Sequence, residues 1–306
     1  NPNITADFFP LDDYFCIRKI VKMIDIEKLI IIETEIWPNL YNEVSKKAEI
    51  IVVNGRISVR TFKKYMNLRR FISGILNKCR KILVQSDLDF KRYEELGVKK
   101  DILKVYPNLK YSIDYPIIDE KNKEEIKENI LYKDRVIIIA GSTRSGEDEV
   151  LLSVFKEINK ENKYQLLLVP RHLKRIEEIE ELLTNMDYSL YSENKKSEVV
   201  LVDKMGILRD LYQVSDIVFV GGTLVNVGGH SILEPLYYGK VPVIGNNYEN
   251  IRDIVEKAAI LGLVKVVNNE DELKNTILSM SSENIDTNKF FQKYNMIDEI
   301  MDEIFL

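Results

Sequence analysis

The sequence has few of the residues that build disulfide, redox and zinc sites. Its 306 residues include two cysteines, Cys16 and Cys79, and two histidines, His172 and His230. The cysteines share no metal-binding or redox spacing, which excludes a disulfide scaffold and indicates a reducing compartment. Two separated histidines without a cysteine cluster do not form a zinc motif. We therefore expect neither a metal nor a cofactor.

Long apolar runs and an excess of positive charge are also absent. No run reaches the roughly 18 apolar residues that span a bilayer, and the opening NPNITADFFPLDD lacks the basic and apolar parts of a signal peptide. A formal net charge of −5 excludes a chain that binds nucleic acid through its overall charge. The sequence has no phosphate-binding loop ending in Gly-Lys-Ser/Thr and no G-x-S-x-G elbow.

Negative charge is missing from one long internal stretch, since no acidic residue lies between Glu49 and Asp87. Apolar residues recur there close to helical spacing, which predicts a basic amphipathic helix over residues 58–78. The basic stretch 56–81 is either a solvated helix face or, as we favour, a surface for an anionic partner, in particular membrane phosphate. Its nine basic residues are Arg56, Arg60, Lys63, Lys64, Arg69, Arg70, Lys78, Arg80 and Lys81.

What the chain does contain is a regular alternation of short β-branched runs and stretches with helical spacing. This pattern is typical of a parallel sheet covered by helices on both faces, in an α/β protein. The length predicts two domains, which we place at residues 1–114 and 115–306. The predicted strands are 28–32, 50–53, 82–85, 102–105, 135–140, 165–169, 199–202, 217–220 and 241–244. The predicted helices include 38–47, 58–78, 87–96, 147–159, 208–214, 270–279 and closing helices in 288–305.

A glycine-rich loop follows the predicted strand 217–220. Two glycine pairs at 221–222 and 228–229 permit left-handed backbone and the close approach of a ligand to bare amides. His230 comes next, and a helix starting at Ser231 would direct free N–H groups toward a phosphate in the loop. Alternatively, Ser231 and Glu234 form a capping box that serves only the helix itself.

The other polar clusters also follow predicted strands, at the end of the sheet where open α/β proteins bind ligands. These clusters are ETEIWPN at 33–39, NGR at 54–56, NLK at 108–110, GSTRSGE at 141–147, PRH at 170–172 and DKMG at 203–206.

Together these motifs resemble those of one family, the 3-deoxy-D-manno-octulosonic acid (Kdo) transferases of lipopolysaccharide synthesis. ETEIWPNL, NGRIS, QSDLD and NLK occur in the family's order in the first half of the chain. GSTRSGE, PRH, DKMG and FVGGTLVNVGGHSILEP continue the resemblance to residue 235.

The resemblance implies a GT-B glycosyltransferase fold, with two Rossmann-like halves and the active site in the cleft between them. It implies inverting transfer of Kdo from CMP-Kdo to a lipid A precursor. The reaction would occur at the cytoplasmic face of the bacterial inner membrane, to which the protein would bind peripherally. The N-terminal half would serve the acceptor, and the C-terminal half would bind CMP.

The resemblance also implies residue roles. Glu33 or Glu35, of which we prefer Glu33 because it directly follows a strand, and Lys110 correspond to positions that stabilise the transition state. A fixed guanidinium and helix amides suit the phosphate of CMP, and a carboxylate suits its ribose hydroxyls. The implied donor residues are Pro170, Arg171, His172, Met205, Gly206, Ile207, Gly229, His230, Ser231 and Glu234.

The sequence departs from the family pattern at three positions. Arg144 stands where histidine is usual, Ile207 where glutamate is usual, and Ser231 where asparagine is usual. The family's N-terminal half also begins earlier, with a membrane anchor and a glutamate that is the general base. We therefore expect a truncated chain that binds CMP but transfers no Kdo by itself.

Alternatives stay open at this point. The chain could be a non-catalytic nucleotide-sugar binding fragment, or a GT-B transferase that uses a UDP-sugar. Arg171 could form a surface salt bridge with Glu177 or Glu178 instead of binding phosphate. Glu33 and Glu35 could serve only the helix start before Pro38.

Overall fold

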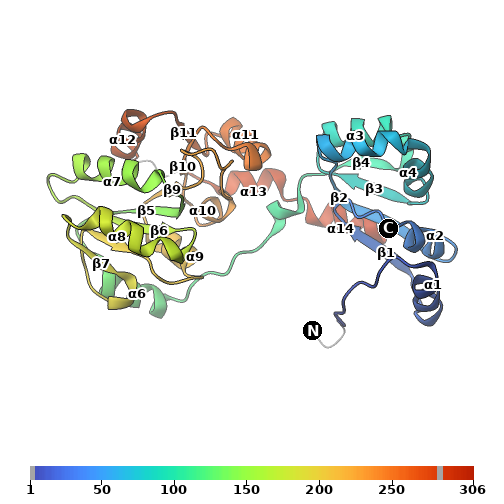
Figure 1. Cartoon of the computed structure of the whole chain (residues 1–306), viewed down its shortest axis with the longest axis horizontal. Coiled ribbons are helices and arrows are strands. Elements are labelled where there is room, and N and C mark those ends of the chain that lie inside the picture. The colour runs from blue at the N-terminus through green and yellow to red at the C-terminus, as the bar shows by residue number, and fades with distance from the viewer. Residues whose placement is uncertain (1–3, 281–284) are drawn as a thin grey trace. The chain divides into compact units, whose positions relative to one another are not determined.

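A computed structural model of the chain describes residues 4–280 and 285–306, so that the first three residues of the predicted first domain lie outside it. The chain divides into two compact units, each built around one parallel sheet (Figure 1). The first unit comprises residues 1–113 and 294–306, and the second comprises residues 114–293.

The sheet of the first unit has the order β1-β2-β3-β4, and all its strands are parallel. The continuous apolar runs of β2 and β3 are buried on both faces, as such runs predict. The strands are β1 (Lys28–Ile32), β2 (Glu49–Gly55), β3 (Lys81–Val84) and β4 (Leu103–Val105). The helices are α1 (Tyr14–Met23), α2 (Pro38–Val44), α3 (Val59–Asn67), α4 (Arg69–Leu76), α5 (Asp87–Glu95) and α14 (Ile297–Phe305).

The alternation of side chains along β2 divides the first core into two layers. Ile50 and Val52 face a cluster that contains apolar residues of α1, α2, α4 and α5. Ile51 and Val53 face the opposite side, where Ile300 of α14 packs against them. We expected the last helix in the second domain, and the structure corrects this because α14 covers the open face of the first sheet.

The predicted amphipathic helix over 58–78 is two helices, α3 and α4, and this is a second correction. The chain leaves helical geometry at Leu68, which has φ −115° and ψ 24°. Phe62 and Tyr65 before the break and Ile72 and Ile75 after it all pack against the same core. Because neither glycine nor proline lies at the break, the periodic pattern of apolar residues in the sequence predicts one continuous helix.

The second unit has a seven-stranded parallel sheet with the order β11-β10-β9-β5-β6-β8-β7. Its strands are β5 (Val136–Thr143), β6 (Tyr164–Pro170), β7 (Tyr188–Leu190), β8 (Val199–Leu201), β9 (Ile217–Val220), β10 (Pro242–Gly245) and β11 (Lys265–Val267). Its helices are α6 (Glu120–Ile130), α7 (Glu147–Ile158), α8 (Ile176–Leu183), α9 (Leu208–Val214), α10 (Leu233–Tyr237), α11 (Arg252–Ile260), α12 (Glu270–Ser279) and α13 (Asn288–Tyr294).

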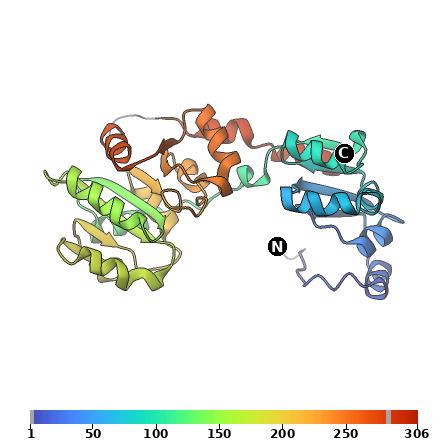
Figure 2. The ribbon, with the colours of Figure 1, turned by 45° about the horizontal axis from the view of Figure 1, so that its top comes forward.

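Helices cover both faces of this second sheet (Figures 1 and 2). Ile138 and Ala140 of β5 share a cluster with apolar residues of α7, α8 and α12. On the opposite face, α9 contacts β5 as well as α6 and α10. From β5 the chain fills one side of the sheet through β6, β7 and β8, then crosses to β9 on the other side. The loops after β5, β6 and β9 therefore flank a topological switch point, where open α/β sheets bind ligands.

Candidate functional site

Three loops at the switch point bring Arg144 together with both histidines of the chain. Arg144 follows β5, His172 follows β6, and His230 ends the glycine-rich loop after β9. The Nε of Arg144 donates to Nε2 of His230 at 3.2 Å, and its Nη1 lies 3.0 Å from Nε2 of His172. The predicted donor residues His172 and His230 are thus joined through a residue that the sequence marked only as a departure.

The two imidazoles in this arrangement are uncharged hydrogen-bond acceptors. A guanidinium only donates, so the Nε2 of His172 and of His230 must accept from Arg144. Burial and the neighbouring charges of Arg144 and Arg171 lower the pKa of His230 to about 4. Desolvation, followed by the charge of Arg144, also lowers the pKa of His172. The positive charge of the cluster therefore resides on the arginines at neutral pH.

The side chain of Arg171 is exposed, while its backbone is fixed by a bond from its N–H to the carbonyl of Thr143 at 3.1 Å. Within residues 4–280 and 285–306 it forms no ion pair. Glu178 instead accepts from Ser145 at 3.0 Å and pairs with Arg175 at 3.1 Å. The alternative of a salt bridge from Arg171 to Glu177 or Glu178 is therefore not observed.

The glycine-rich loop is held in place by Glu147, a residue whose role the sequence analysis missed. Its carboxylate is fully buried and accepts four backbone N–H groups. Oε2 accepts from Arg144 at 2.9 Å and from Gly222 at 2.7 Å, and Oε1 accepts from Thr223 and Leu224 at 2.9 Å. The only sequence signal was a glutamate directly after Gly146 at a helix start.

Glycine is required where this loop meets its neighbours. Gly222 has φ 73°, and a Cβ there would lie 3.0 Å from the His230 ring. A Cβ at Gly221 would lie 2.5 Å from the carbonyl oxygen of Ser142, which is closer than real Cβ contacts come. Because of these two positions, the loop packs directly on the end of β5.

The helix after the loop begins later than predicted. α10 starts at Leu233 with Ile232 as its N-cap, and it has five residues. Ser231 Oγ accepts from Leu233 N–H at 3.3 Å, so the capping box with Glu234 does not form. Both predictions for Ser231 are therefore wrong. Ser231 neither forms a capping box with Glu234 nor begins a phosphate-binding helix, because the helix begins two residues later, at Leu233.

Glu234 lies half-buried beside the other predicted donor segment. Its carboxylate is 3.5 Å from Nε of Arg209 on α9, the helix that directly follows the 205–207 segment. Burial raises the pKa of Glu234, and the charge of Arg209 opposes that shift. A half-buried carboxylate with one weak partner keeps free acceptor capacity for hydroxyl groups.

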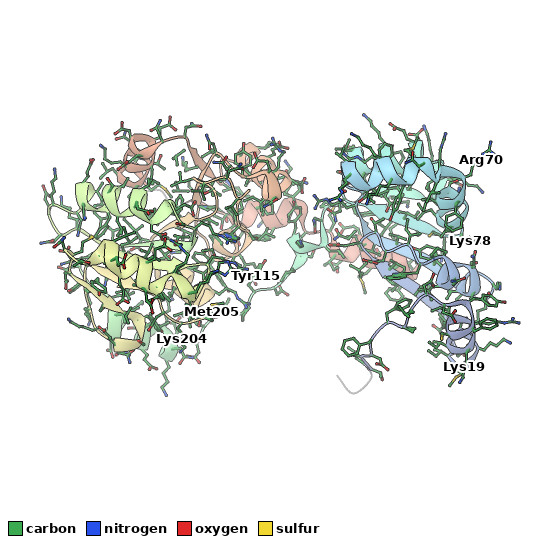
Figure 3. The ribbon with its side chains drawn as sticks, in the orientation of Figure 1. Lys19, Arg70, Lys78, Tyr115, Lys204 and Met205 are labelled. Carbon is green, nitrogen blue, oxygen red and sulfur yellow. The ribbon has the colours of Figure 1, made fainter. Side chains whose placement is uncertain are left out.

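The remaining predicted donor residues lie at the end of β6, in the segment after β8 and in the glycine-rich loop after β9. Pro170 is the last residue of β6 and is buried. Met205 is 62% exposed, and Figure 3 shows it at the surface of the second unit. Gly206 has φ 86°, and Ile207 is the N-cap of α9. Gly229 also has a positive φ, 85°, and its N–H donates to Gly222.

In the first unit, Glu33 has an unusual backbone conformation. Its φ is 63° directly after β1, and its N–H donates to the Val53 carbonyl at 2.8 Å. A non-glycine residue in this region of φ is uncommon, and such residues gather at functional sites. The side chains of Glu33 and Glu35 are both exposed.

Lys110 follows β4 on a short 3-10 helix (Leu109–Ser112) and is exposed. That helix is anchored by Asn54, which accepts from Leu109 N–H at 3.2 Å, and by Gln85, which accepts from Asn108 at 3.1 Å. Because β1 and β4 are the two edges of the sheet, Glu33 and Lys110 are separated by three strand spacings, roughly 14 Å. The structure does not bring these two candidates into contact.

The basic stretch 56–81 is only partly free of counter-charge. Arg80 pairs with Glu49 at 2.6 Å and Lys81 with Glu303 at 2.6 Å, although both acids lie outside the stretch. The other seven basic side chains are exposed, and none forms an ion pair in the part of the chain that the structure describes. These are Arg56, Arg60, Lys63, Lys64, Arg69, Arg70 and Lys78.

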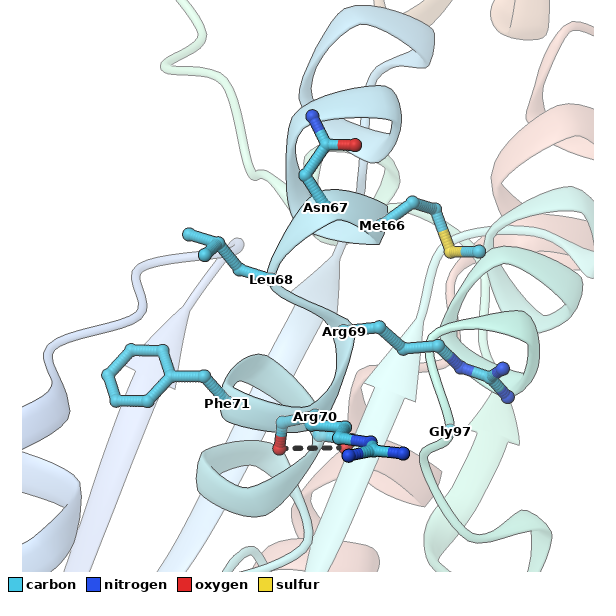
Figure 4. Close-up of a pocket in the computed structure, with 8 residues that line it drawn as sticks. Met66, Asn67, Leu68, Arg69, Arg70, Phe71 and Gly97 are labelled. Carbon is cyan, nitrogen blue, oxygen red and sulfur yellow. Dashed lines mark hydrogen bonds between the residues drawn. The ribbon is translucent and has the colours of Figure 1, made fainter.

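A hollow of about 740 Å³ lies at the junction of α3 and α4, beside these charges (Figure 4). Arg69, Arg70 and the exposed Leu68 and Phe71 line it. Over the described residues, no helix is long and apolar enough to cross a membrane.

Comparison with known proteins assigns the chain first to a class. Residues 120–296 match the family model described as glycosyl transferases group 1, and residues 2–113 match the model of 3-deoxy-D-manno-octulosonic-acid transferase (kdotransferase). The chain is also similar to a glycosyltransferase structure from Rickettsia africae, with a TM-score of 0.58 over 98% of this chain and 84% of that one, at 17% identity. The predicted α/β GT-B fold is confirmed, and the chain is a glycosyltransferase.

Curated relatives then define the family. The 3-deoxy-D-manno-octulosonic acid transferase of Aquifex aeolicus is 32% identical over 278 residues, which cover 89% of this chain and 71% of that protein. The chain belongs to the Kdo transferase family. A bifunctional glycosyltransferase/methyltransferase of Fusobacterium nucleatum is 41% identical over 306 residues, 96% of this chain and 47% of that protein.

The chain is also similar to the solved structure of a single domain. It is the C-terminal CMP-Kdo binding domain of WaaA from Acinetobacter baumannii, with a TM-score of 0.52 and 24% identity. The similarity covers 58% of this chain and 97% of that domain. The chain spans between 47% and 65% of the length of the first three curated relatives it matches.

Proposed function

We propose that this protein transfers Kdo from CMP-Kdo to a lipid A precursor, with inversion at the transferred sugar. The observation that carries the proposal is the exposed guanidinium of Arg171, which forms no ion pair in the described part of the chain and lies at the switch point of the second sheet. An unpaired guanidinium in such a place suits a nucleotide phosphate. Membership of the Kdo transferase family supports Kdo as the sugar.

On this proposal the second unit binds the donor. Arg171, beside Pro170 and His172, contacts the phosphate, whose charge rises when CMP leaves. Glu234 accepts from the ribose hydroxyls, and Gly229, His230 and Ser231 bring the loop close to the nucleotide. Backbone groups of Met205, Gly206 and Ile207 contact the base or ribose from the neighbouring loop. A fold match to a structure described as a CMP-Kdo binding domain supports this assignment.

The first unit would supply the groups that stabilise the transition state. Glu33 remains the preferred acid over Glu35, since its left-handed φ of 63° is the kind of strain that functional sites retain. Lys110 would add a mobile positive charge from the end of β4. Because the two lie at opposite edges of the sheet, we assign them to different parts of the substrates.

We further propose an anionic membrane surface as a partner, with the protein bound peripherally at the cytoplasmic face of the inner membrane. The support is a set of seven exposed basic residues in the stretch 56–81 that form no ion pair within the described residues, next to the exposed apolar Leu68 and Phe71. Basic residues bind anionic lipid, and apolar side chains enter the boundary between headgroups and chains.

The test is a transfer assay with CMP-Kdo and a lipid A precursor, in which mass spectrometry detects addition of Kdo to the lipid. It is run with CMP-Kdo and, in parallel, with UDP-sugars as donors. Addition of Kdo to the lipid supports the proposal, and transfer of another sugar from a UDP donor contradicts it.

A further inference from the structure

Arg144 carries a charge that nothing in the described chain balances. Its Nε and Nη1 bond the two imidazoles, and among residues 4–280 and 285–306 no acceptor bonds its Nη2. The side chain is half-buried, so the charge is partly removed from water. Placing a guanidinium in this way has a desolvation cost that an acidic partner normally offsets.

The carboxylates near Arg144 are engaged elsewhere. The two carboxylate oxygens of Glu147 accept hydrogen bonds from four backbone N–H groups. The carboxylate of Glu178 accepts a hydrogen bond from Ser145 and forms an ion pair with Arg175. Asp148 is fully buried and pairs with Arg175. None of the three is free to neutralise Arg144, and Arg171 is likewise unpaired in the described part of the chain.

The two imidazoles fix the direction of the Arg144 fork. Each accepts one N–H, so the guanidinium is held from two sides by neutral rings on loops from different strands. The backbone of Arg144 is fixed as well, because its N–H donates to Glu147 at 2.9 Å. A guanidinium held in this way, with an open donor edge, is preorganised for the oxygens of a phosphate.

We propose that Arg144 is a binding residue for the phosphate of a cytidine nucleotide, acting beside Arg171, and that His172 and His230 position it. This inference rests on the proposed function, because it assigns the residue to the same donor site. It differs from a purely structural role, in which Arg144 would only tie three loops together. A structural tie would affect the binding of any ligand in the site, whereas a phosphate contact affects only ligands that carry phosphate.

The experiment measures dissociation constants for CMP and for cytidine by calorimetry, at constant pH and salt. Arg144→Gln removes the charge and keeps a polar side chain, and Arg144→Lys keeps the charge without the fork. Lys156→Gln is the matched control, because it removes one exposed positive charge near the far end of α7, nine residues and about 14 Å along the helix from Glu147. Circular dichroism checks that each variant is folded.

We expect the preference for CMP over cytidine to fall about 10- to 100-fold in Arg144→Gln, the scale of a lost charged hydrogen bond. The cytidine constant should not change, Arg144→Lys should fall between, and Lys156→Gln should match the wild type. Equal losses for CMP and cytidine, or no loss in Arg144→Gln, would overturn this inference while leaving the proposed function intact. A wild-type protein that does not bind CMP would overturn both.

Discussion

Replacing Glu147 by glutamine should destabilise the second unit, although the two side chains are nearly the same size. The carboxylate accepts two N–H groups on each oxygen, from Arg144 and Gly222 on one and from Thr223 and Leu224 on the other. The amide of glutamine keeps one oxygen and presents an NH2 group in place of the other. The two backbone N–H groups that bonded the replaced oxygen then meet the NH2 group, which is itself a donor. They are left without an acceptor in a fully buried site.

The magnitude follows from the number of donors that lose their acceptor. A buried, unsatisfied donor costs about 1–3 kcal/mol, so two cost about 2–6 kcal/mol of unfolding free energy. Glu149→Gln is the control, because Glu149 lies in the same first turn of α7 and is exposed. We expect that change to cost less than about 1 kcal/mol, the scale of a charge near a helix end.

Two measurements check this prediction. Urea unfolding followed by circular dichroism gives the difference in free energy, and hydrogen exchange reports the amides of the loop. In Glu147→Gln the amides of 222–224 should exchange faster than in wild type and in Glu149→Gln. If Glu147→Gln unfolds within about 0.5 kcal/mol of wild type and its loop amides keep their protection, the assignment of Glu147 as the anchor of the loop is wrong.

The remaining predictions concern the phosphate site, the basic stretch and one acid pair. Arg171→Ala should weaken CMP binding by about 2–3 kcal/mol in calorimetry, without a change in circular dichroism, and equal affinity would remove Arg171 from the site. Changing four basic residues to glutamine should reduce binding to anionic vesicles by about 1 kcal/mol per charge, less at high salt; they are Lys63, Lys64, Arg69 and Arg70. As a control, four exposed lysines of the second unit are changed to glutamine, and this should have little effect on sedimentation with vesicles. If the control lowers vesicle binding as much, the net charge of the protein explains the binding and the basic stretch does not. The control residues are Lys121, Lys156, Lys160 and Lys195. Hydrogen bonds from Lys104 and Lys81 lower the pKa of Glu303 to about 2. Its contribution to stability is therefore present above the unfolded pKa of about 4.3 and is lost as the pH falls toward 2. Urea unfolding is followed by the fluorescence of Trp37, the only tryptophan, which belongs to the same unit as Glu303. The difference in unfolding free energy between wild type and Glu303→Gln should disappear as the pH falls over this range. A difference that stays constant with pH would refute this prediction.

Central strands could be predicted from the sequence because they are buried on both faces. The run at 217–220 is β9, which is buried along its whole length and has the bounds expected. The run at 28–32 is β1, an edge strand that is only partly buried but whose apolar sequence KLIII was enough to predict its bounds. β7 and β11 were missed, since each is a three-residue strand at an edge of the sheet and carries too little apolar signal. The break at Leu68 was missed because both halves of the pattern face one core.

For the candidate site as well, the sequence predicted which residues belong to it but not the tertiary contacts that join them. The rule that ligands bind at the carboxyl ends of strands identified Arg171, His172 and His230 as candidates. It could not identify what joins them, because the contacts of Arg144 and Glu147 link residues up to 86 positions apart. The late start of α10 was missed for a local reason, since Ser-x-x-Glu also fits a loop in which Ser231 bonds Leu233.

The packing of α14 shows what a sequence pattern leaves open. Closing helices in 288–305 were predicted from the sequence, but the sheet that the last one would cover was not. Ile300 and Ile304 of α14 complete an apolar cluster on β2 and β3, two strands that lie more than 200 residues earlier in the chain. The strand residues of this cluster are Ile51, Val53 and Leu83. Which sheet a terminal helix joins depends on which apolar face lacks a cover, and that is a property of the folded unit.

The nucleotide preference of the chain tests the central claim most directly. Thermal unfolding is followed with CMP, UDP or neither, at equal concentrations. We predict that CMP at about 100 times its dissociation constant adds about 2.7 kcal/mol of stability, while UDP at the same concentration adds far less. The stabilisation by CMP should be reduced in Arg171→Ala. Stabilisation by UDP that equals or exceeds that by CMP, or none by either nucleotide, would contradict a CMP-Kdo donor site.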